Sequence, residues 1–418
     1  MVFGGTIRGT LNRFRVVGES FFDLGCEAFL SRRIMVTVFL ILMGTLASFQ
    51  AYSWAMSQDG PGNGYADPGE SVETGRTETI TLTAAGDCLM HVPETRSGLQ
   101  ADGSYRFDTF FADVADLIQE GDYCSTNLES AMAGPESGYT GFPMFNCPDE
   151  IAHTFKQAGF DLVVTANNHS LDRGYTGGLR TLKVLREAGL DTLGTYRSPA
   201  EANSYLIKDI RGVKVGYLAY TYGTNGIPVP DGHPEYVNLL EKQRILADIK
   251  ALRPQVDVLI LVLHWGVEYQ PLPGQDQILM AREFIEAGAD AILGSHPHVI
   301  QTMEVLQVKG KSKFVIYGMG NFISNQQELE RKCGIVLKLR FKKDFDNKDT
   351  RLIEASYTPT FTYRYNGPGR IHYRVIPIEK TINRIQQGAD PDMNRADLPL
   401  LQAAFQSTLH QLGPGFRE

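Results

Sequence analysis

The sequence predicts a layered α/β fold for the larger part of this chain. Apolar segments typical of strands alternate with segments of helical periodicity through residues 79–320, and this alternation is typical of sheets covered by helices. Five of the apolar segments are followed directly by carboxylate, amide or imidazole side chains. Ligands of such sheets bind at the carboxyl ends of the strands, so we expect these side chains to meet.

Length and charge limit the possible classes of protein. The 418 residues suffice for one large domain or two ordinary ones. The formal net charge is −8, and the first 33 residues are net positive, so the body is more acidic than the whole chain. An acidic body argues against nucleic acid as the main partner.

The N-terminal part has the pattern of a signal-anchor. Residues 34–56 carry no formal charge and would reach roughly 34 Å as a helix, enough to cross a hydrocarbon layer of about 30 Å. Arg32 and Arg33 precede this segment, so the positive-inside rule predicts that residues 1–33 are cytoplasmic. We therefore expect a single-pass protein of the cell membrane with an extracytoplasmic body. The alternative is a signal peptide cleaved near residues 51–53.

The predicted membrane segment is followed by a linker, and the body after it contains four cysteines. Residues 57–78 are rich in turn formers and poor in apolar residues, which predicts a flexible linker. The body holds four cysteines without a C-x-x-C pair, so disulfides and buried free thiols both stay open. These cysteines are Cys88, Cys124, Cys147 and Cys333.

The first part of the body should alternate strands and helices. A β-branched strand over residues 79–85 leads to Gly86 and Asp87, with His91 four residues further on. Helical spacing follows over residues 107–119. A short strand at 123–126 then precedes Glu129.

The next elements bring a second polar block. A buried strand at 161–166 is followed by Asn167, Asn168, His169 and Asp172. A helix cap and turn would explain one Asn and the Asp, but not the whole block. The other elements expected here are helices at 149–158, 174–187 and 239–252, a hairpin of 204–210 with 213–221, and a long loop at 223–234.

Three histidines follow two apolar strands. Residues 256–263 form the most apolar strand and end at His264, while residues 291–293 lead to His296 and His298 around a proline. In an extended segment, residues i and i+2 point the same way, so we expect both imidazoles to face one point. Further elements are expected as a helix at 275–287, strands at 303–308, 313–317, 334–340, 352–363 and 373–378, and a helix at 399–412.

These strand ends together predict a metal centre. Each member alone has an ordinary explanation as a turn residue or a buried histidine. The mixture of carboxylate, amide and imidazole is typical of a site for two divalent ions such as Mn, Fe or Zn. The candidate ligands are Asp87, His91, Glu129, Asn168, His264, His296 and His298.

The same motifs, in this order, resemble the CapA family of poly-γ-glutamate capsule-synthesis proteins. They are Gly-Asp, Asn-Leu-Glu, Asn-Asn-His-Ser-Leu-Asp-Arg-Gly, His-Trp-Gly, Gly-Ser-His-Pro-His and Gly-Asn-Phe. That family is similar to calcineurin-like metallophosphoesterases, so the resemblance implies a metallophosphatase-type β-sandwich flanked by helices. We expect a CapA-like domain at 79–325, a β-rich completion of it at 326–380, and a C-terminal tail with a short helix at 381–418.

The resemblance also implies a role for each site residue. Asp87 and His298 would hold the first ion, and Glu129 would bridge both ions. The second ion would be held by Asn168, His264 and His296. His169 would act as the catalytic acid and Asp172 would orient it. The phosphoesterase pattern has Asp at the bridging position, where this chain has Glu129.

The function implied by the resemblance is a membrane-anchored component of poly-γ-glutamate capsule synthesis or export. The metal site would act on or hold the polymer outside the membrane, possible reactions being metal-dependent hydrolysis or transfer. Other capsule-synthesis membrane proteins would be its partners. Two alternatives stay open: a metal-dependent phosphoesterase of envelope phosphodiesters, and a non-catalytic metal-containing binding module.

Overall fold

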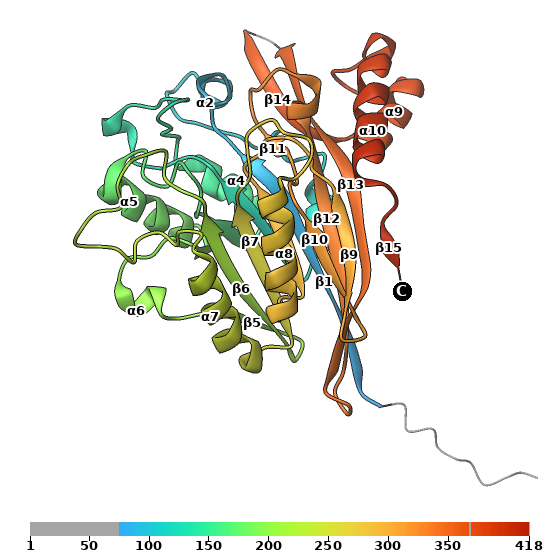
Figure 1. The fold of residues 1–418 in the computed structure, drawn as a ribbon. Helices are drawn as coiled ribbons and strands as arrows, with labels where there is room; N and C mark the ends of the chain where they lie inside the picture. The colour runs from blue at the N-terminus through green and yellow to red at the C-terminus, as the bar shows by residue number, and fades with distance from the viewer. Residues whose placement is uncertain (1–74, 368, 418) are drawn as a thin grey trace, which may run out of the picture. The chain divides into compact units, whose positions relative to one another are not determined.

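The computed structural model describes residues 75–367 and 369–417 (Figure 1). The predicted cytoplasmic segment, the predicted membrane helix at 34–56 and nearly all of the predicted linker lie outside these residues. Within the described part of the chain, none of the helices combines the length and the apolar character needed to cross a membrane.

The first of two sheets contains nine strands and joins the beginning of the body to its end. Its order is β14-β13-β12-β1-β2-β3-β4, while β11 pairs with β1 and β15 with β13. The run from β1 to β4 is parallel, and the long strands β12, β13 and β14 are antiparallel. The bounds are β1 Thr77–Cys88, β2 Tyr123–Leu128, β3 Leu162–Val164, β4 Asp191–Leu193, β11 Asn321–Ile323, β12 Cys333–Asp344, β13 Asp349–Gly367, β14 Arg370–Pro377 and β15 Phe416–Arg417.

The second sheet contains six strands in the order β5-β6-β7-β8-β10-β9. Its four central strands, β6, β7, β8 and β10, are parallel. Both expected hairpins, β5 with β6 and β9 with β10, are present. The most apolar strand of the sequence, β7, lies between β6 and β8 and is buried over its whole length. The bounds are β5 Leu206–Ile210, β6 Val213–Thr221, β7 Val258–His264, β8 Ala291–Ser295, β9 Met303–Val308 and β10 Lys311–Ile316.

The two sheets pack face to face, and helices cover their outer sides. Side chains of both sheets, such as Ile80 and Leu162 from the first and Val215 and Ile260 from the second, form one apolar core. A second cluster packs α3, α4 and α5 on the first sheet, and a third packs α7 and α8 on the second (Figure 1). The helices are α2 Val92–Gly98, α3 Ala115–Gln119, α4 Glu150–Ala158, α5 Gly174–Glu187, α6 Pro199–Ala202, α7 Lys242–Leu252, α8 Gln275–Ala287, α9 Ile378–Gln386 and α10 Leu398–Leu412.

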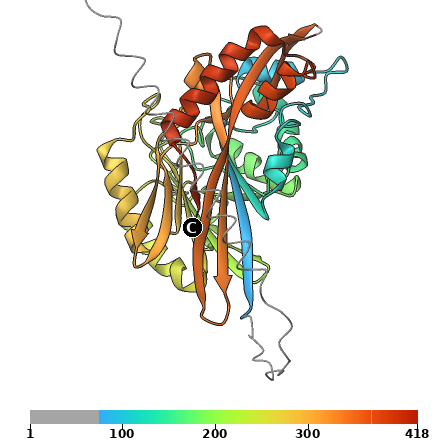
Figure 2. The same ribbon diagram turned by 90° about the vertical axis from the view of Figure 1, so that its right-hand side faces the viewer.

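The two C-terminal helices belong to the packed body. Figure 2 shows α9 and α10 beside the long antiparallel strands. Leu401 and Ala404 of α10 are fully buried in the core between the sheets, together with Ile378 and Ile385 of α9. The sequence predicts α10, but it misses α9 and α2.

One predicted helix is mostly wrong. The helical spacing over residues 107–119 yields only the short helix α3, and residues 107–114 form successive turns. The amide of Phe110 donates to the carbonyl of Phe107, and that of Val114 to Phe111. Three buried phenylalanines drive this segment into the core, and a spacing of three to four residues suits consecutive turns as well as a helix.

The cysteines of the body are free thiols. Cys88, Cys124, Cys147 and Cys333 are all buried and unpaired, which decides between the two possibilities left open by the sequence. Burial raises the pKa of each thiol, so they behave as small apolar side chains.

Candidate metal centre

The polar side chains at the strand ends meet where the two sheets come together. Asp87 lies near the end of β1, Glu129 directly follows β2, and His264 is the last residue of β7. All of them are almost completely buried. The remaining members of the cluster are Asn168, His169 and Asp172 after β3, and His296 and His298 after β8.

Glu129 stands at the centre of this cluster without a hydrogen-bond partner. Neither of its carboxylate oxygens is bonded, although the side chain is fully buried. Its Oε1 lies 3.6 Å from His264 Nε2 and 3.8 Å from His298 Nε2. Burial raises the pKa of Glu129 to about 8. Burying a charged carboxylate without a partner costs free energy, and a bound cation at this position would remove that cost.

Asp87 is held in place by two donors. Its Oδ1 accepts from Asn127 Nδ2 at 2.8 Å, and its Oδ2 accepts from the backbone N–H of His296 at 3.0 Å. The same Oδ2 lies 3.7 Å from His298 Nδ1. Burial and the neighbouring Glu129 charge raise the pKa of Asp87 well above its usual range. Asp87, Glu129 and His298 thus offer one compact group of ligand atoms.

A second ligand group shares Glu129 with the first. It consists of Glu129, His264 and His296, and the Oδ1 of Asn168 lies 2.7 Å from His264 Nε2. Burial lowers the pKa of His264 far below its usual range and that of His296 to about 2. Both imidazoles are therefore neutral, which is the form that binds metal ions.

The two histidines around the proline reach the site by a different backbone path from the one expected. Strand β8 ends at Ser295, and His296 and His298 adopt left-handed conformations with φ of 94° and 57°. The extended backbone expected at this position is therefore wrong, but the two rings still come together, because ring nitrogens of His296 and His298 each lie close to Glu129 and to Glu268. Such conformations cost roughly 1–3 kcal/mol each in non-glycine residues and concentrate at functional sites.

The residues present suit divalent metal ions. Both oxygens of Glu129 and the Nδ1 of His296 are buried and unbonded. Carboxylates, neutral imidazoles and an amide oxygen form a donor set typical of Mn, Fe or Zn. Two groups of candidate ligand atoms share the carboxylate of Glu129.

Sequence reasoning did not select Glu268 for the site. The structure groups Glu268 with His296 and His298 as a third set of ligand atoms, on the less buried side. The only signal was its position four residues after His264.

His169 and Asp172 form a separate pair beside the ligands. The Nδ1 of His169 lies 2.7 Å from Asp172 Oδ2, which also accepts the backbone N–H of Phe145 at 2.7 Å. The other ring nitrogen, His169 Nε2, lies 3.5 Å from Asn225 Nδ2 and 4.0 Å from Glu129 Oε1. Burial opposes protonation of His169, but Asp172 and Glu129 outweigh it and raise its pKa. His169 can therefore carry a proton at the edge of the site.

His91 lies apart from the ligand groups of the described residues. Its Nδ1 is 3.7 Å from Glu94 Oε1, and its ring packs edge-on against Phe145, whose other contact is the ring of His169. His91 thus borders the site through Phe145.

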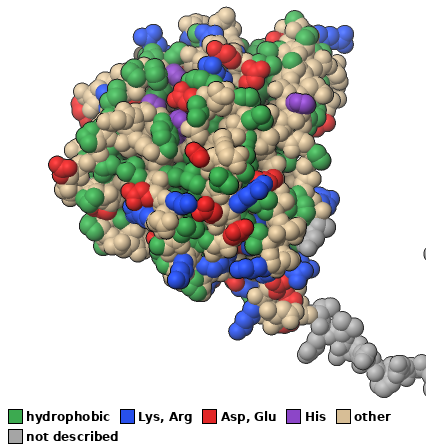
Figure 3. Space-filling model, viewed as in Figure 1, with side chains coloured by type: hydrophobic (Ala, Val, Ile, Leu, Met, Phe, Trp, Pro, Cys, Tyr) green, Lys and Arg blue, Asp and Glu red, His purple; other side chains and the backbone are tan. Residues whose placement is uncertain are grey.

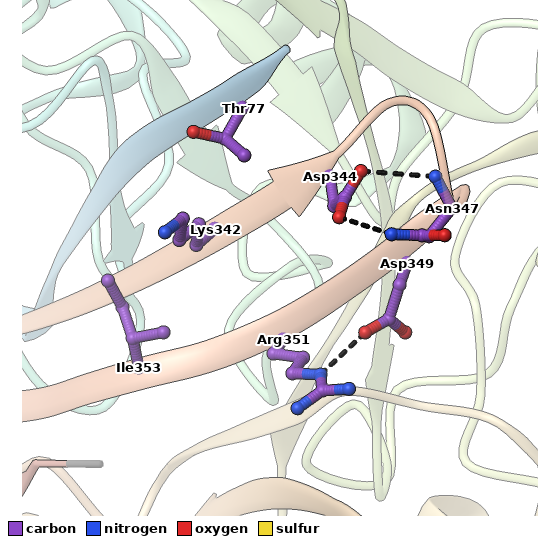
Figure 4. A pocket seen from close by; sticks show the side chains of 7 residues that line it. All are labelled: Thr77, Lys342, Asp344, Asn347, Asp349, Arg351 and Ile353. Atoms are coloured by element: carbon purple, nitrogen blue, oxygen red, sulfur yellow. Dashed lines mark hydrogen bonds and ion pairs between the residues drawn. The ribbon is translucent and has the colours of Figure 1, made fainter. Parts of the chain in front are cut away.

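A wide hollow of the described surface lies elsewhere. It has about 710 Å³ and lies on the hairpin between β12 and β13, where Figure 4 shows Asp344 bonded to Asn347 and Asp349 to Arg351. Thr77, at the start of β1, borders this hollow, whereas Asp87 is ten residues further along the strand, roughly 33 Å away. The carboxylates in this hollow are already paired, so we assign the chemistry to the strand ends.

Two solved structures overlap this chain partially. A putative 5′-nucleotidase from Staphylococcus aureus in complex with alpha-ketoglutarate matches with a TM-score of 0.45 and 13% identity, over 79% of this chain and 58% of that chain. A novel phosphatase from Mycoplasma pneumoniae matches with a TM-score of 0.41 and 13% identity, over 68% and 94% of the two chains.

Residues 81–326 match a family described as "Bacterial capsule synthesis protein PGA_cap". The capsule biosynthesis protein CapA of Bacillus anthracis is 29% identical over 259 residues, which are 60% of this chain and 61% of that protein. The PGA biosynthesis protein CapA of Bacillus subtilis is 23% identical over 313 residues, 73% of this chain and 77% of that protein. This chain thus covers less than two thirds of the Bacillus anthracis relative, and the matched family region contains every strand-end residue described above.

Proposed function

This chain belongs to the PGA_cap family of bacterial capsule synthesis proteins, and on that basis we propose that it is a metal-dependent component of poly-γ-glutamate capsule production. In this proposal the strand ends hold two divalent ions that act on or hold the polymer outside the membrane. The names of the Bacillus relatives support the process, and the geometry of the buried cluster supports the chemistry.

The observation that carries the proposal is the state of Glu129. A fully buried carboxylate with two unbonded oxygens, close to His264 and His298, is hard to explain as a structural element. Native proteins pair nearly all such groups. Bridging two cations satisfies both oxygens at once.

The assigned roles follow the two ligand groups. Asp87 and His298 would hold one ion, His264 and His296 would hold the other with Asn168, and Glu129 would contribute to both; the grouping of the ligand atoms supports these roles. When bound, such a pair of ions polarises an oxygen of the ligand and supplies an activated water.

His169 is the proposed proton donor. Its Nδ1 is tied to Asp172, so its Nε2 is the atom that gives a proton to a departing group. Its ring orientation is further fixed by edge contact with Phe145 at 4.7 Å between ring centroids. Asp172 acts through His169 and is a positioning residue.

We further propose that the protein is anchored in the cell membrane by residues 34–56, with its body outside. Poly-γ-glutamate is the proposed ligand, and other membrane proteins of capsule synthesis are the proposed partners. The uncharged segment after Arg32 and Arg33 supports the anchor.

A metal-dependent phosphoesterase of envelope phosphodiesters is the second candidate function. The pairing of His169 with Asp172 favours it, because a protonated imidazole beside two ions also suits the departure of an alkoxide. A non-catalytic binding module would use the ligands but not the proton on His169.

Complementation of a deletion strain tests the proposed function. His169→Ala should leave metal content unchanged and reduce polymer formation by about 10²–10⁴-fold, as expected for a lost general acid. The matched control is His233→Ala, a histidine of the exposed loop after β6. Normal cell-bound polyglutamate with His169→Ala would reject catalysis on the polymer, and hydrolysis of a phosphodiester by the purified protein would then identify the phosphoesterase.

A further inference from the structure

We propose that Tyr269 and Arg331 form a subsite beside the metal centre that binds the next anionic group along the substrate, a carboxylate of a γ-linked glutamyl chain. This inference rests on the proposed function and adds to it the residues that recognise the polymer. None of the metal ligands can perform this task, because their side chains are buried.

The exposed border of the metal centre is made largely of aromatic and apolar side chains. Tyr222 is 47% exposed and its ring lies 4.5 Å from that of His296, while Tyr269 is 38% exposed and lies 6.0 Å from His298. Val267, 63% exposed, belongs to the same loop as Tyr269. Figure 3 shows histidine side chains reaching the surface among hydrophobic ones on the upper part of this face.

Tyr269 has a strained backbone conformation and is held in it by a hydrogen bond. Its backbone is left-handed, with φ of 65°, a conformation that bulky residues rarely adopt. The backbone N–H of Tyr269 donates to the carbonyl of Pro297 at 2.7 Å, so the loop is fixed to the segment that carries His296 and His298. A strained residue fixed to a metal-ligand segment is typical of a functional position.

The guanidinium of Arg331 stacks on the ring of Tyr269. The guanidinium carbon lies 3.5 Å from the centre of the Tyr269 ring, the geometry of a cation–π contact. The backbone carbonyl of Arg331 accepts from Asn321 Nδ2 at 2.8 Å, and Asn321 Oδ1 lies 3.0 Å from His298 Nδ1. Arg331 is therefore fixed to the ligand His298 by two routes, one through Tyr269 and one through Asn321.

The edge of the Arg331 guanidinium, and not its face, is the part that can bind an anion. Stacking uses its face, and the planar edge is the part that binds carboxylates in two-pronged fashion. In this structure the partner at that edge is Glu328, 3.1 Å from Arg331 and more than half exposed. Because the Glu328 side chain is mostly in solvent, its pairing with Arg331 is weak and a substrate carboxylate can displace it. Glu268 also lies nearby, hydrogen-bonded to Tyr269 and grouped with His296 and His298, and Glu330 directly precedes Arg331.

A γ-linked glutamyl chain matches this arrangement. It carries a free carboxylate on every residue, and methylene groups separate neighbouring carboxylates. One carboxylate or amide oxygen would lie at the ions, the methylenes against the Tyr269 ring, and the next carboxylate at Arg331. A simple phosphodiester without a second anion would leave Arg331 unused.

Binding of a γ-linked glutamate trimer to the metal-loaded full chain tests the subsite. Arg331→Gln should weaken binding by roughly tenfold at low salt, and the effect should shrink as salt rises. Glu328→Gln should strengthen binding, because it frees the guanidinium. Tyr269→Asn, which tolerates the left-handed backbone, should weaken binding without loss of stability. The control is Arg197→Gln, which breaks an exposed pair of the same 3.1 Å length with Glu201.

A second ligand separates the subsite from the proposed function. In a trimer whose middle residue is γ-aminobutyrate, the chain length is kept and one carboxylate is missing. The account predicts that wild type and Arg331→Gln bind this analogue equally. If the glutamate trimer binds both proteins equally, the subsite is wrong and the proposed function stands. If metal-loaded wild type does not bind the trimer at all, the proposed function and the subsite both fail.

Discussion

Glu129 is surrounded by imidazoles and hydrogen-bonded to none of them. Its raised pKa, about 8, arises mainly from burial, so without a bound cation the fold would favour the protonated acid below about pH 8. A carboxyl group whose folded pKa exceeds its unfolded value stabilises the fold at low pH. That contribution is lost as pH rises from about 4.5 through about 8.

This linkage makes a prediction for Glu129→Gln in the metal-free protein. The neutral amide escapes the cost of ionisation, so the variant should match wild type near pH 5 and exceed it above about pH 8, by up to a few kcal/mol. Denaturant unfolding with a chelator present measures the difference. Because Glu129 raises the pKa of His169, both proteins carry His169→Ala in this comparison. Glu187→Gln, an exposed position, is the control. A difference that does not change with pH would contradict the assignment.

At the scale of elements, the site depends on how closely β1 approaches β11. Gly86 precedes Asp87, and a Cβ placed on Gly86 would lie 2.0 Å from the carbonyl oxygen of Gly320. That carbonyl accepts the backbone N–H of Asp87 at 3.0 Å. The missing side chain therefore allows the backbone pairing that aims Asp87 at the ions.

Gly86→Ala should accordingly separate β1 from β11. Overpacking against backbone atoms cannot be relieved by a rotamer change, so we expect a loss of about 2–3 kcal/mol in unfolding free energy. Metal content should fall as well. Gly232→Ala is the matched control, because a Cβ there meets no atom within 4 Å. Equal melting temperatures for the two variants would show that the close approach is unimportant.

The sequence predicts most of the elements that have strong periodicity. The parallel strands and α5 and α8 are found because their apolar spacing is local and their ends carry glycine or polar residues. Helix α9 is missed although Ile378, Ile382 and Ile385 have helical spacing, because the expected last strand extends through Ile378.

For the candidate site too, the sequence predicts some features and misses others. Strand ends could be predicted to meet, because topology alone brings them together. The left-handed backbone of His296 and His298, the approach of Glu268 and the stacking of Arg331 on Tyr269 could not, because each depends on contacts between distant loops.

At the scale of the molecule, the centre exists only while both sheets are packed together. Asp87 and Glu129 come from the first sheet, and the three ligand histidines come from the second. Across the far end, Lys343 of β12 pairs with Asp257, just before β7, at 2.6 Å. Ions that bind both sheets should therefore stabilise the whole unit.

Topology is the other prediction at this scale. Protease added to intact cells should remove the body, leaving a fragment with residues 34–56 in the membrane. The reason is the uncharged segment that follows Arg32 and Arg33. A cytoplasmic protein expressed in the same cells serves as the control for lysis. A body protected from protease in intact cells would rule out the proposed anchor.

The metal content of the purified full chain tests the central claim most directly. The account predicts two divalent ions per chain for wild type. It predicts about one ion for His264→Ala, loss of both ions for Glu129→Ala, and no change for the control Arg197→Gln. Unfolding temperature should fall in parallel with ion loss. Equal ion content in wild type, His264→Ala and Glu129→Ala would contradict a centre of two ions bridged by Glu129.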